Sequence, residues 1–174
     1  MLSSLNLRTA RGTLTMRPEA DNDADATFLF SLFAHTKAAE MALMPLDDAG
    51  KMFLLRMQFR SMTATYRQQF PNARFEIVQL DGAPIGRLIT DVQADCVRYV
   101  DIALLPQHRG GGIATALMTA VLEEPRRIGL PGRVSVLSGN IASLRLCRRV
   151  GMTVRTEHPP FVELEWRATD RSGQ

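Results

Sequence analysis

The stretch PQHRGGGIATALM, residues 106–118, places three consecutive glycines directly before a helical pattern of apolar and small residues. Glycine is costly in regular structure and suits positions where the backbone bends sharply or approaches another group closely. The first N–H groups of a helix have no partner within the helix, and the helix dipole is positive at that end. Because an apolar strand pattern precedes the glycines, we predict a strand, a tight loop and a helix N-terminus that together bind an anion.

The spacing of the residues in this loop excludes two common phosphate-binding motifs. No Lys followed by Ser or Thr stands where a G-x-x-x-x-G-K-[ST] loop needs it. A dinucleotide G-x-G-x-x-G motif would need a glycine at Thr115 and would follow the first strand of its unit. The loop does fit the pattern R-x-x-G-x-A, with Arg109, Gly112 and Ala114.

Composition limits the class of protein. The chain has 174 residues, 45% of them hydrophobic and 22% charged, which suits one globular domain. Two cysteines form no metal-ligand cluster and no disulfide framework, so we expect a cytoplasmic protein without a metal. No apolar run is long enough to span a membrane and no secretory signal is present, so we expect no membrane partner.

The positive charge of the chain raises the question of nucleic acids. The net charge is +3, and the basic residues are arginines apart from Lys37 and Lys51. Arginine is well shaped for phosphates, but here the arginines are scattered and are not interleaved with aromatic residues. We therefore expect no nucleic-acid partner, while a nucleotide or nucleic acid bound by the same loop remains an alternative.

Hydrophobic periodicity predicts an α/β (α+β) domain with the order β-α-α-β-β-β-α-β-α-β-β. The domain covers residues 12–167, between a flexible leader (1–11) and a flexible tail (168–174). Pro125 is expected to end or kink the helix that follows the glycines. The predicted strands are 12–17, 74–80, 83–90, 96–104, 132–137, 152–157 and 161–166, and the predicted helices are 24–36, 47–69, 113 onward and 140–150.

Two motifs and the order of elements carry a family resemblance. The pattern R-x-x-G-x-A is similar to the Q/R-x-x-G-x-G/A signature of the GNAT superfamily of N-acetyltransferases, and the element order resembles the GNAT fold. The later stretch NIASLRLCRRVGM resembles the family pattern N-x-x-A-x-x-L-Y-x-x-x-G-F. Residues 53–88 also look like a bacterial GNAT branch of unassigned substrate. The resemblance implies a mostly antiparallel sheet flanked by helices, acetyl-CoA as co-substrate, and direct acetyl transfer to a primary amine of a small molecule or peptide.

The resemblance also assigns residues to the cofactor. The backbone of Ile102 and Leu104 would hold the pantetheine arm, and Asn140 would either contact the cofactor or only cap its helix. The loop would hold the pyrophosphate with Arg109, Gly110, Gly111, Gly112, Ile113 and Ala114.

Asp101 is our candidate for the base that deprotonates the amine. We expect it to share one face of its strand with Tyr99 and Ala103. A carboxylate is a weak base for an ammonium group, so burial or a water relay would be needed, and a structural ion pair with an arginine is the alternative. Three acidic residues are held in reserve: Glu76, Asp91 and Asp95.

The general acid is where this chain departs from the family. Cys147 stands where the family carries a tyrosine. The thiol would either protonate the departing thiolate or act as a small buried hydrophobe, and Tyr99 could take the acid role instead. This departure leaves open a second function, that of a catalytically weak or silent acyl-CoA-binding module. A homodimer is possible by resemblance alone.

Overall fold

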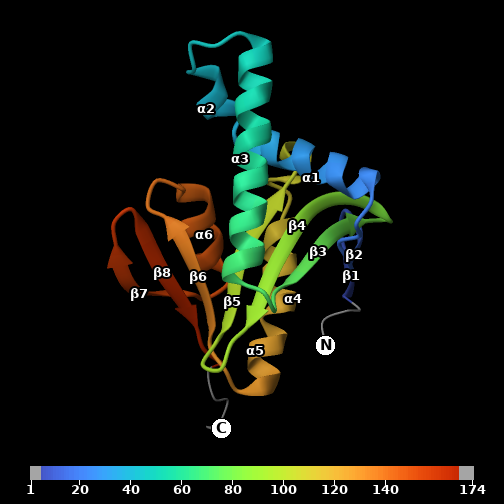
Figure 1. Cartoon of the computed structure of the whole chain (residues 1–174). Coiled ribbons are helices and arrows are strands. Elements are labelled where there is room, and N and C mark those ends of the chain that lie inside the picture. The colour runs from blue at the N-terminus through green and yellow to red at the C-terminus, as the bar shows by residue number, and fades with distance from the viewer. Residues whose placement is uncertain (1–4, 169–174) are drawn as a thin grey trace, which may run out of the picture.

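A computed structural model describes residues 5–168, which form one eight-stranded sheet in the order β1-β2-β3-β4-β5-β6-β8-β7 (Figure 1). All neighbouring strands are antiparallel except β5 and β6, which are parallel. The mixed, mostly antiparallel sheet flanked by helices confirms the predicted fold class. The strands are β1 Asn6–Thr9, β2 Gly12–Pro18, β3 Arg74–Leu80, β4 Ala83–Val92, β5 Val97–Leu104, β6 Gly132–Leu137, β7 Thr153–His158 and β8 Phe161–Trp166.

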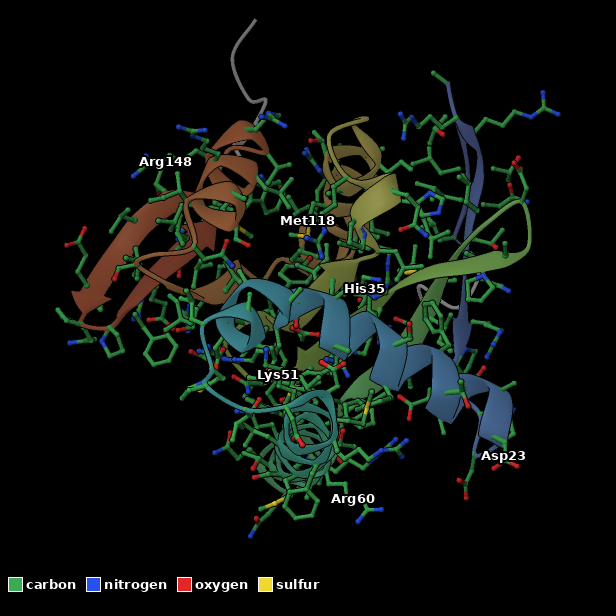
Figure 2. All side chains as sticks on the ribbon, turned by 90° about the horizontal axis from the view of Figure 1, so that it is seen from above. Asp23, His35, Lys51, Arg60, Met118 and Arg148 are labelled. Carbon is green, nitrogen blue, oxygen red and sulfur yellow. The ribbon has the colours of Figure 1, made fainter. Side chains whose placement is uncertain are left out.

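The helices cover the two faces of the sheet. On one face lie α1, α2 and α3, and the upper half of α3 rises beyond the sheet (Figure 1). On the other face lie α4, α5 and α6, so that Arg60 on α3 and Met118 on α4 appear on opposite sides of the molecule (Figure 2). The helices are α1 Asp23–Thr36, α2 Ala38–Ala42, α3 Asp48–Gln69, α4 Ile113–Val121, α5 Glu123–Ile128 and α6 Ile141–Arg149.

Side-chain caps fix where α1 and α3 begin. Asn22 Oδ1 accepts the N–H of Asp25 at 2.8 Å before α1. Asp47 Oδ1 accepts the N–H of Gly50 at 2.8 Å before α3. These residues satisfy N–H groups that have no partner within the helix, which is why the helices begin within a residue or so of the predicted positions.

The hydrophobic core has two parts. The larger cluster lies between the sheet and α4 and α6, and it includes Leu88, Leu117 and Leu164. The smaller cluster joins α1, α2 and α3 through Phe33, Met41 and Leu55. The face of the sheet beneath α1 and α3 is thus less completely filled with apolar side chains than the face beneath α4.

Two details differ from the prediction, and a third agrees with it. The flexible leader is wrong for residues 6–9, because they form β1, which pairs with β2. Helix α2 was not predicted. The break expected from Pro125 is present: α4 ends at Val121, four residues before the proline, and α5 begins at Glu123 with Pro125 in its first turn, where a backbone N–H is not needed.

The proposed division into leader, domain and tail otherwise stays a prediction. Residues 1–4 of the leader and residues 169–174 of the tail lie outside the described part of the chain.

Candidate functional site

Strands β5 and β6 separate after a short paired segment. They pair only at residues 97–99 of β5 and then diverge (Figure 1). Leu105 directly follows β5, and its N–H donates to the carbonyl oxygen of Ile85 in β4 at 2.9 Å. The backbone of Leu105 therefore points toward β4. Because this direction alternates along an antiparallel strand, the backbone groups of Leu104 and Ile102 face the gap toward β6. The predicted pantetheine contacts therefore lie at an unpaired strand edge.

The glycine loop, residues 109–114, connects the end of β5 to α4. Gly110 and Gly112 have positive φ angles of 73° and 82°, which side-chain-bearing residues rarely adopt. A Cβ atom built on either glycine meets nothing within 4 Å, so the loop is open to a ligand. The N–H groups of Ile113 and Ala114 belong to the first turn of α4 and have no partner within the helix.

Arg109 ties this loop to the sheet. Its Nε donates to the carbonyl oxygen of Leu104 at 2.8 Å. One carbonyl at the β5 edge is therefore occupied, while the positive charge of the guanidinium stays beside the first turn of α4. The loop combines this charge with the positive end of a helix dipole, which suits it to an anion.

Asn140 caps α6, as one of the two alternatives predicted. Its Oδ1 accepts the N–H of Ser143 at 3.1 Å. A contact between Asn140 and a cofactor stays a prediction.

A β-bulge places Tyr99 and Asp101 on opposite faces of the sheet. Asp101 lies opposite Ile89 and Tyr99 lies opposite Thr90, so Val100 is an extra residue that reverses the alternation of side chains. The expectation that Tyr99 and Asp101 share one face is wrong for this reason.

Tyr99 is consequently part of the core beneath α4. It is 2% exposed, and its hydroxyl donates to the carbonyl oxygen of Val121 at 3.0 Å. Burial raises the pKa of the Tyr99 hydroxyl far above its usual value. A phenol so placed is a structural group, and nothing in its surroundings supports the predicted role as general acid.

Cys147 also lies in the larger core cluster. It is 4% exposed, and burial raises the pKa of its thiol to about 11. A weak hydrogen-bond donor with this environment supports the small-hydrophobe alternative over the predicted proton donor.

Asp101 lines a cavity of about 530 Å³ on the face of the sheet beneath α1 and α3, which we call the acceptor cavity. Both hydrogen bonds from Arg87 go to Oδ2 of Asp101, from Nε at 2.9 Å and from Nη2 at 2.6 Å. Within residues 5–168 no side chain donates to Oδ1 of Asp101, whose side chain is 23% exposed. The predicted ion pair is present, and one carboxylate oxygen remains open to a ligand.

Two polar residues of α3, Tyr66 and Gln58, also line the acceptor cavity. Burial, and secondarily the charge of Asp101, raise the pKa of Tyr66, while Arg87 opposes this. The Tyr66 phenol therefore stays protonated at neutral pH and can donate a hydrogen bond. Oε1 of Gln58 is buried without a partner within the described residues, so it can accept one.

The remaining wall of the acceptor cavity has an apolar part, formed by Leu32, Phe33, Met62 and Ala103, and a polar part, formed by Thr36, Ser61 and Lys37, which is paired with Glu40. A group with N–H donors and an apolar neighbour matches these surroundings.

The three reserve carboxylates do not line the acceptor cavity. Glu76 lies opposite Leu88 and so faces the core beneath α4. Asp95 pairs with Arg133 at 2.6 Å at the surface, and Asp91 accepts from Gln93 at 2.9 Å.

The sequence analysis named none of the cavity residues Arg87, Gln58 and Tyr66 as a site residue. Arg87 did carry a signal, because it interrupts the apolar strand PIGRLIT and an arginine there needs a partner. Gln58 carried none.

Residues 5–168 contain no group of three or more His, Cys, Asp or Glu placed to hold a metal ion. Over the same range, no helix has both the length and the apolar character needed to cross a membrane.

Solved structures share this fold. PaiA N-acetyltransferase from Thermoplasma acidophilum, solved with coenzyme A, is 14% identical with a TM-score of 0.66, over 89% of this chain and 99% of that chain. RimJ from Mycobacterium smegmatis, solved with CoA-disulfide, is 17% identical with a TM-score of 0.65, over 94% of this chain and 86% of that chain. PseH from Campylobacter jejuni is 12% identical with a TM-score of 0.58, over 90% and 99%.

Sequence comparisons give the family. Among curated proteins no significant match is found. The model of the acetyltransferase (GNAT) family matches residues 46–152, which include α3, the splayed strand β5, the glycine loop and α6. With the separated strands, the open loop and this match in agreement, the chain belongs to the acetyltransferase (GNAT) family.

Proposed function

We propose that the protein is an acetyl-CoA-dependent N-acetyltransferase that acts on a primary amine of a small molecule or peptide. The observation that carries the proposal is the position of Asp101. Its carboxylate opens into the acceptor cavity, and the next residue, Ile102, presents its backbone to the gap between β5 and β6. An amine held by Asp101 would thus lie beside the strand edge proposed for the cofactor.

The residues present fit acetyl-CoA. The glycine loop has room for a pyrophosphate beside the N–H groups of Ile113 and Ala114. The strand edge offers the backbone groups of Ile102 and the N–H of Leu104 to an extended pantetheine arm, while the carbonyl of Leu104 accepts from Arg109. When bound, acetyl-CoA supplies an acetyl group activated as a thioester.

The chain itself would bind and deprotonate the amine. In our proposal Oδ1 of Asp101 and Oε1 of Gln58 accept hydrogen bonds from the ammonium group, and Arg87 keeps the carboxylate in place. Asp101 then takes the proton directly or through a water molecule. Tyr66, protonated at neutral pH, replaces Cys147 and Tyr99 as our candidate donor of a proton or hydrogen bond on the acceptor side.

Related structures support an amine as the acceptor class. They include RimL, described as a ribosomal L7/L12 alpha-N-protein acetyltransferase, besides the PaiA and PseH N-acetyltransferases. These proteins differ in acceptor, so the identity of the amine remains open between small molecules and peptides. A cytoplasmic location and a homodimer remain predictions.

One observation favours a second candidate, an acyl-CoA-binding module without turnover. Cys147, at the position of the family tyrosine, is buried in the core. A panel of primary amines and peptide N-termini, assayed for release of free thiol from acetyl-CoA, separates the two. Turnover with at least one amine is expected, and CoA binding without turnover of any amine would favour the module.

A further inference from the structure

A residue from the N-terminal hairpin, the segment 6–18 that forms β1 and β2, lies against the glycine loop. A Cβ atom built on Gly111 would lie 2.5 Å from Cζ and Nε of Arg11 and 2.8 Å from its Nη1. Unlike its two neighbours, Gly111 has no positive φ angle. At Gly110 and Gly112 the glycine permits the positive φ angle, whereas at Gly111 the space of a side chain is occupied by the Arg11 guanidinium.

The turn that carries Arg11 is held by its own hydrogen bonds. The N–H of Arg11 donates to the hydroxyl of Thr9 at 3.1 Å, and that hydroxyl donates to the carbonyl oxygen of Gly12 at 2.8 Å. Gly12 supplies the φ of 135° that the turn needs. The backbone of Arg11 is thus fixed beside the loop before any ligand binds.

A groove of about 700 Å³ runs between this hairpin and α4. Leu7 and Thr9 form one wall, Thr115 and Thr119 form another, and Gly111 and Gly112 close one end. The groove therefore begins at the glycine loop, and the N-terminal hairpin forms one of its walls.

The charge of Arg11 has no protein partner in the described structure. Within residues 5–168 no carboxylate lies within ion-pair distance of its guanidinium, whereas twelve ion pairs form between other side chains. Arginine presents a planar fork of donors that matches phosphate oxygens. An uncompensated guanidinium packed on a phosphate-binding loop is thus available to an anion there.

We propose that the N-terminal hairpin is part of the cofactor site and that Arg11 binds the pyrophosphate of CoA together with the first turn of α4. This inference rests on the proposed function, because it takes CoA as the ligand of the glycine loop. It assigns a role to a segment that lies outside the matched family residues 46–152.

The first test is calorimetric titration of CoA and dephospho-CoA into the wild type, Arg11→Ala and Arg60→Ala. Both ligands contain the pyrophosphate, and only CoA contains the 3′-phosphate. Loss of a charge-assisted contact should weaken the binding of both ligands to Arg11→Ala about tenfold. Arg60→Ala removes an equal charge from α3 on the opposite side of the molecule and should bind both ligands like the wild type (Figure 2).

A second variant tests the contact itself. Gly111→Ala would displace the guanidinium tip of Arg11, which can move, so we expect an unchanged unfolding midpoint and several-fold weaker CoA binding. The double variant Arg11→Ala/Gly111→Ala should bind CoA no more weakly than Arg11→Ala, because the two changes remove one interaction.

Three results would overturn the inference while wild-type CoA binding stands: an unchanged CoA affinity in Arg11→Ala, a loss seen with CoA but absent with dephospho-CoA, or additive losses in the double variant. A wild-type protein that binds neither ligand would contradict the proposed function, and the inference with it.

Discussion

At the scale of single residues, the account depends on how Arg87 holds Asp101. The guanidinium donates to one carboxylate oxygen only, and Asp101 lines the acceptor cavity. An ion pair of this kind orients the carboxylate, and within residues 5–168 its second oxygen has no side-chain donor and can accept from an ammonium group. Asp101 can therefore form a structural ion pair and also bind the amine. Substitution of Asp101 tests whether it has the second role.

Asp101→Asn keeps the size of the side chain and removes its charge. General-base catalysis contributes about 10²–10⁴-fold, so we expect kcat to fall by at least about 100-fold. Binding of acetyl-CoA should be unchanged, because Asp101 faces α1 and α3 while the glycine loop lies at the start of α4. Steady-state kinetics and calorimetry measure the two quantities.

Asp95→Asn is the matched control for this change, since Asp95 forms an ion pair at the surface outside the acceptor cavity. If Asp101→Asn keeps the wild-type kcat, or if both variants lose kcat equally, Asp101 is not the general base.

The two tyrosines of the chain provide a natural pair of variants. Tyr66→Phe removes the hydroxyl in the acceptor cavity and should lower kcat about tenfold or more, with little effect on stability. Tyr99→Phe removes a buried hydrogen bond to Val121 and should cost about 1 kcal/mol of unfolding free energy with kcat unchanged. Kinetics and urea unfolding of both variants test the assignment, and the opposite pattern would return Tyr99 to the site.

At the scale of elements, local signals in the sequence account for most of the fold. Asn22, Asp47 and Asn140 cap helices that begin within about one residue of the predicted starts, and alternation predicted strands 132–137 and 161–166 without error. These signals act within a few residues of one another. They are therefore readable without knowledge of the tertiary structure.

The missed elements depend on distant partners. Strand β1 has four residues and becomes a strand by pairing with the edge of β2. The bulge at Val100 arises from the register between β4 and β5, and no residue of CVRYVDIAL marks it. The bulge determines the face of the sheet on which Tyr99 lies. Because the sequence does not mark this bulge, Tyr99 was wrongly predicted to lie beside Asp101.

The first turn of α1 should contribute stability that depends on pH. Arg17 donates to both carboxylate oxygens of Asp25, at 2.6 and 2.7 Å, and holds the pKa of Asp25 at about 2. A lowered pKa stabilises the folded state above the ordinary value of about 3.9 and ceases to do so as the pH falls through about 2.

The difference in unfolding free energy between the wild type and Asp25→Asn, measured with urea, should thus be constant above about pH 5 and shrink toward pH 2. A difference that does not change over this range would contradict the role of the ion pair.

At the scale of the whole molecule, the two faces of the sheet differ in what they hold. The face beneath α4 and α6 holds the larger core, while the face beneath α1 and α3 leaves the acceptor cavity beside β5. The glycine loop lies where β5 ends, so the cofactor region and the acceptor region meet at one strand.

Contacts between distant segments at this scale explain what the sequence could not predict about the site. The glycine run indicated an anion, and the open loop agrees with that expectation. Arg11 is separated from Gly111 by one hundred positions in the chain, and Arg87 approaches Asp101 only through the pairing of β4 with β5. No local pattern encodes such contacts.

The most direct test of the central claim is calorimetric titration of acetyl-CoA into the wild type, Gly112→Glu and Gly129→Glu. Both glycines have positive φ angles, and a Cβ atom on either meets nothing within 4 Å, so the two variants carry the same strain and charge. Gly112 lies in the glycine loop, and Gly129 lies at the end of α5. We predict binding to the wild type and to Gly129→Glu and no measurable binding to Gly112→Glu. Equal affinity in all three proteins, or no binding to the wild type, would contradict the account.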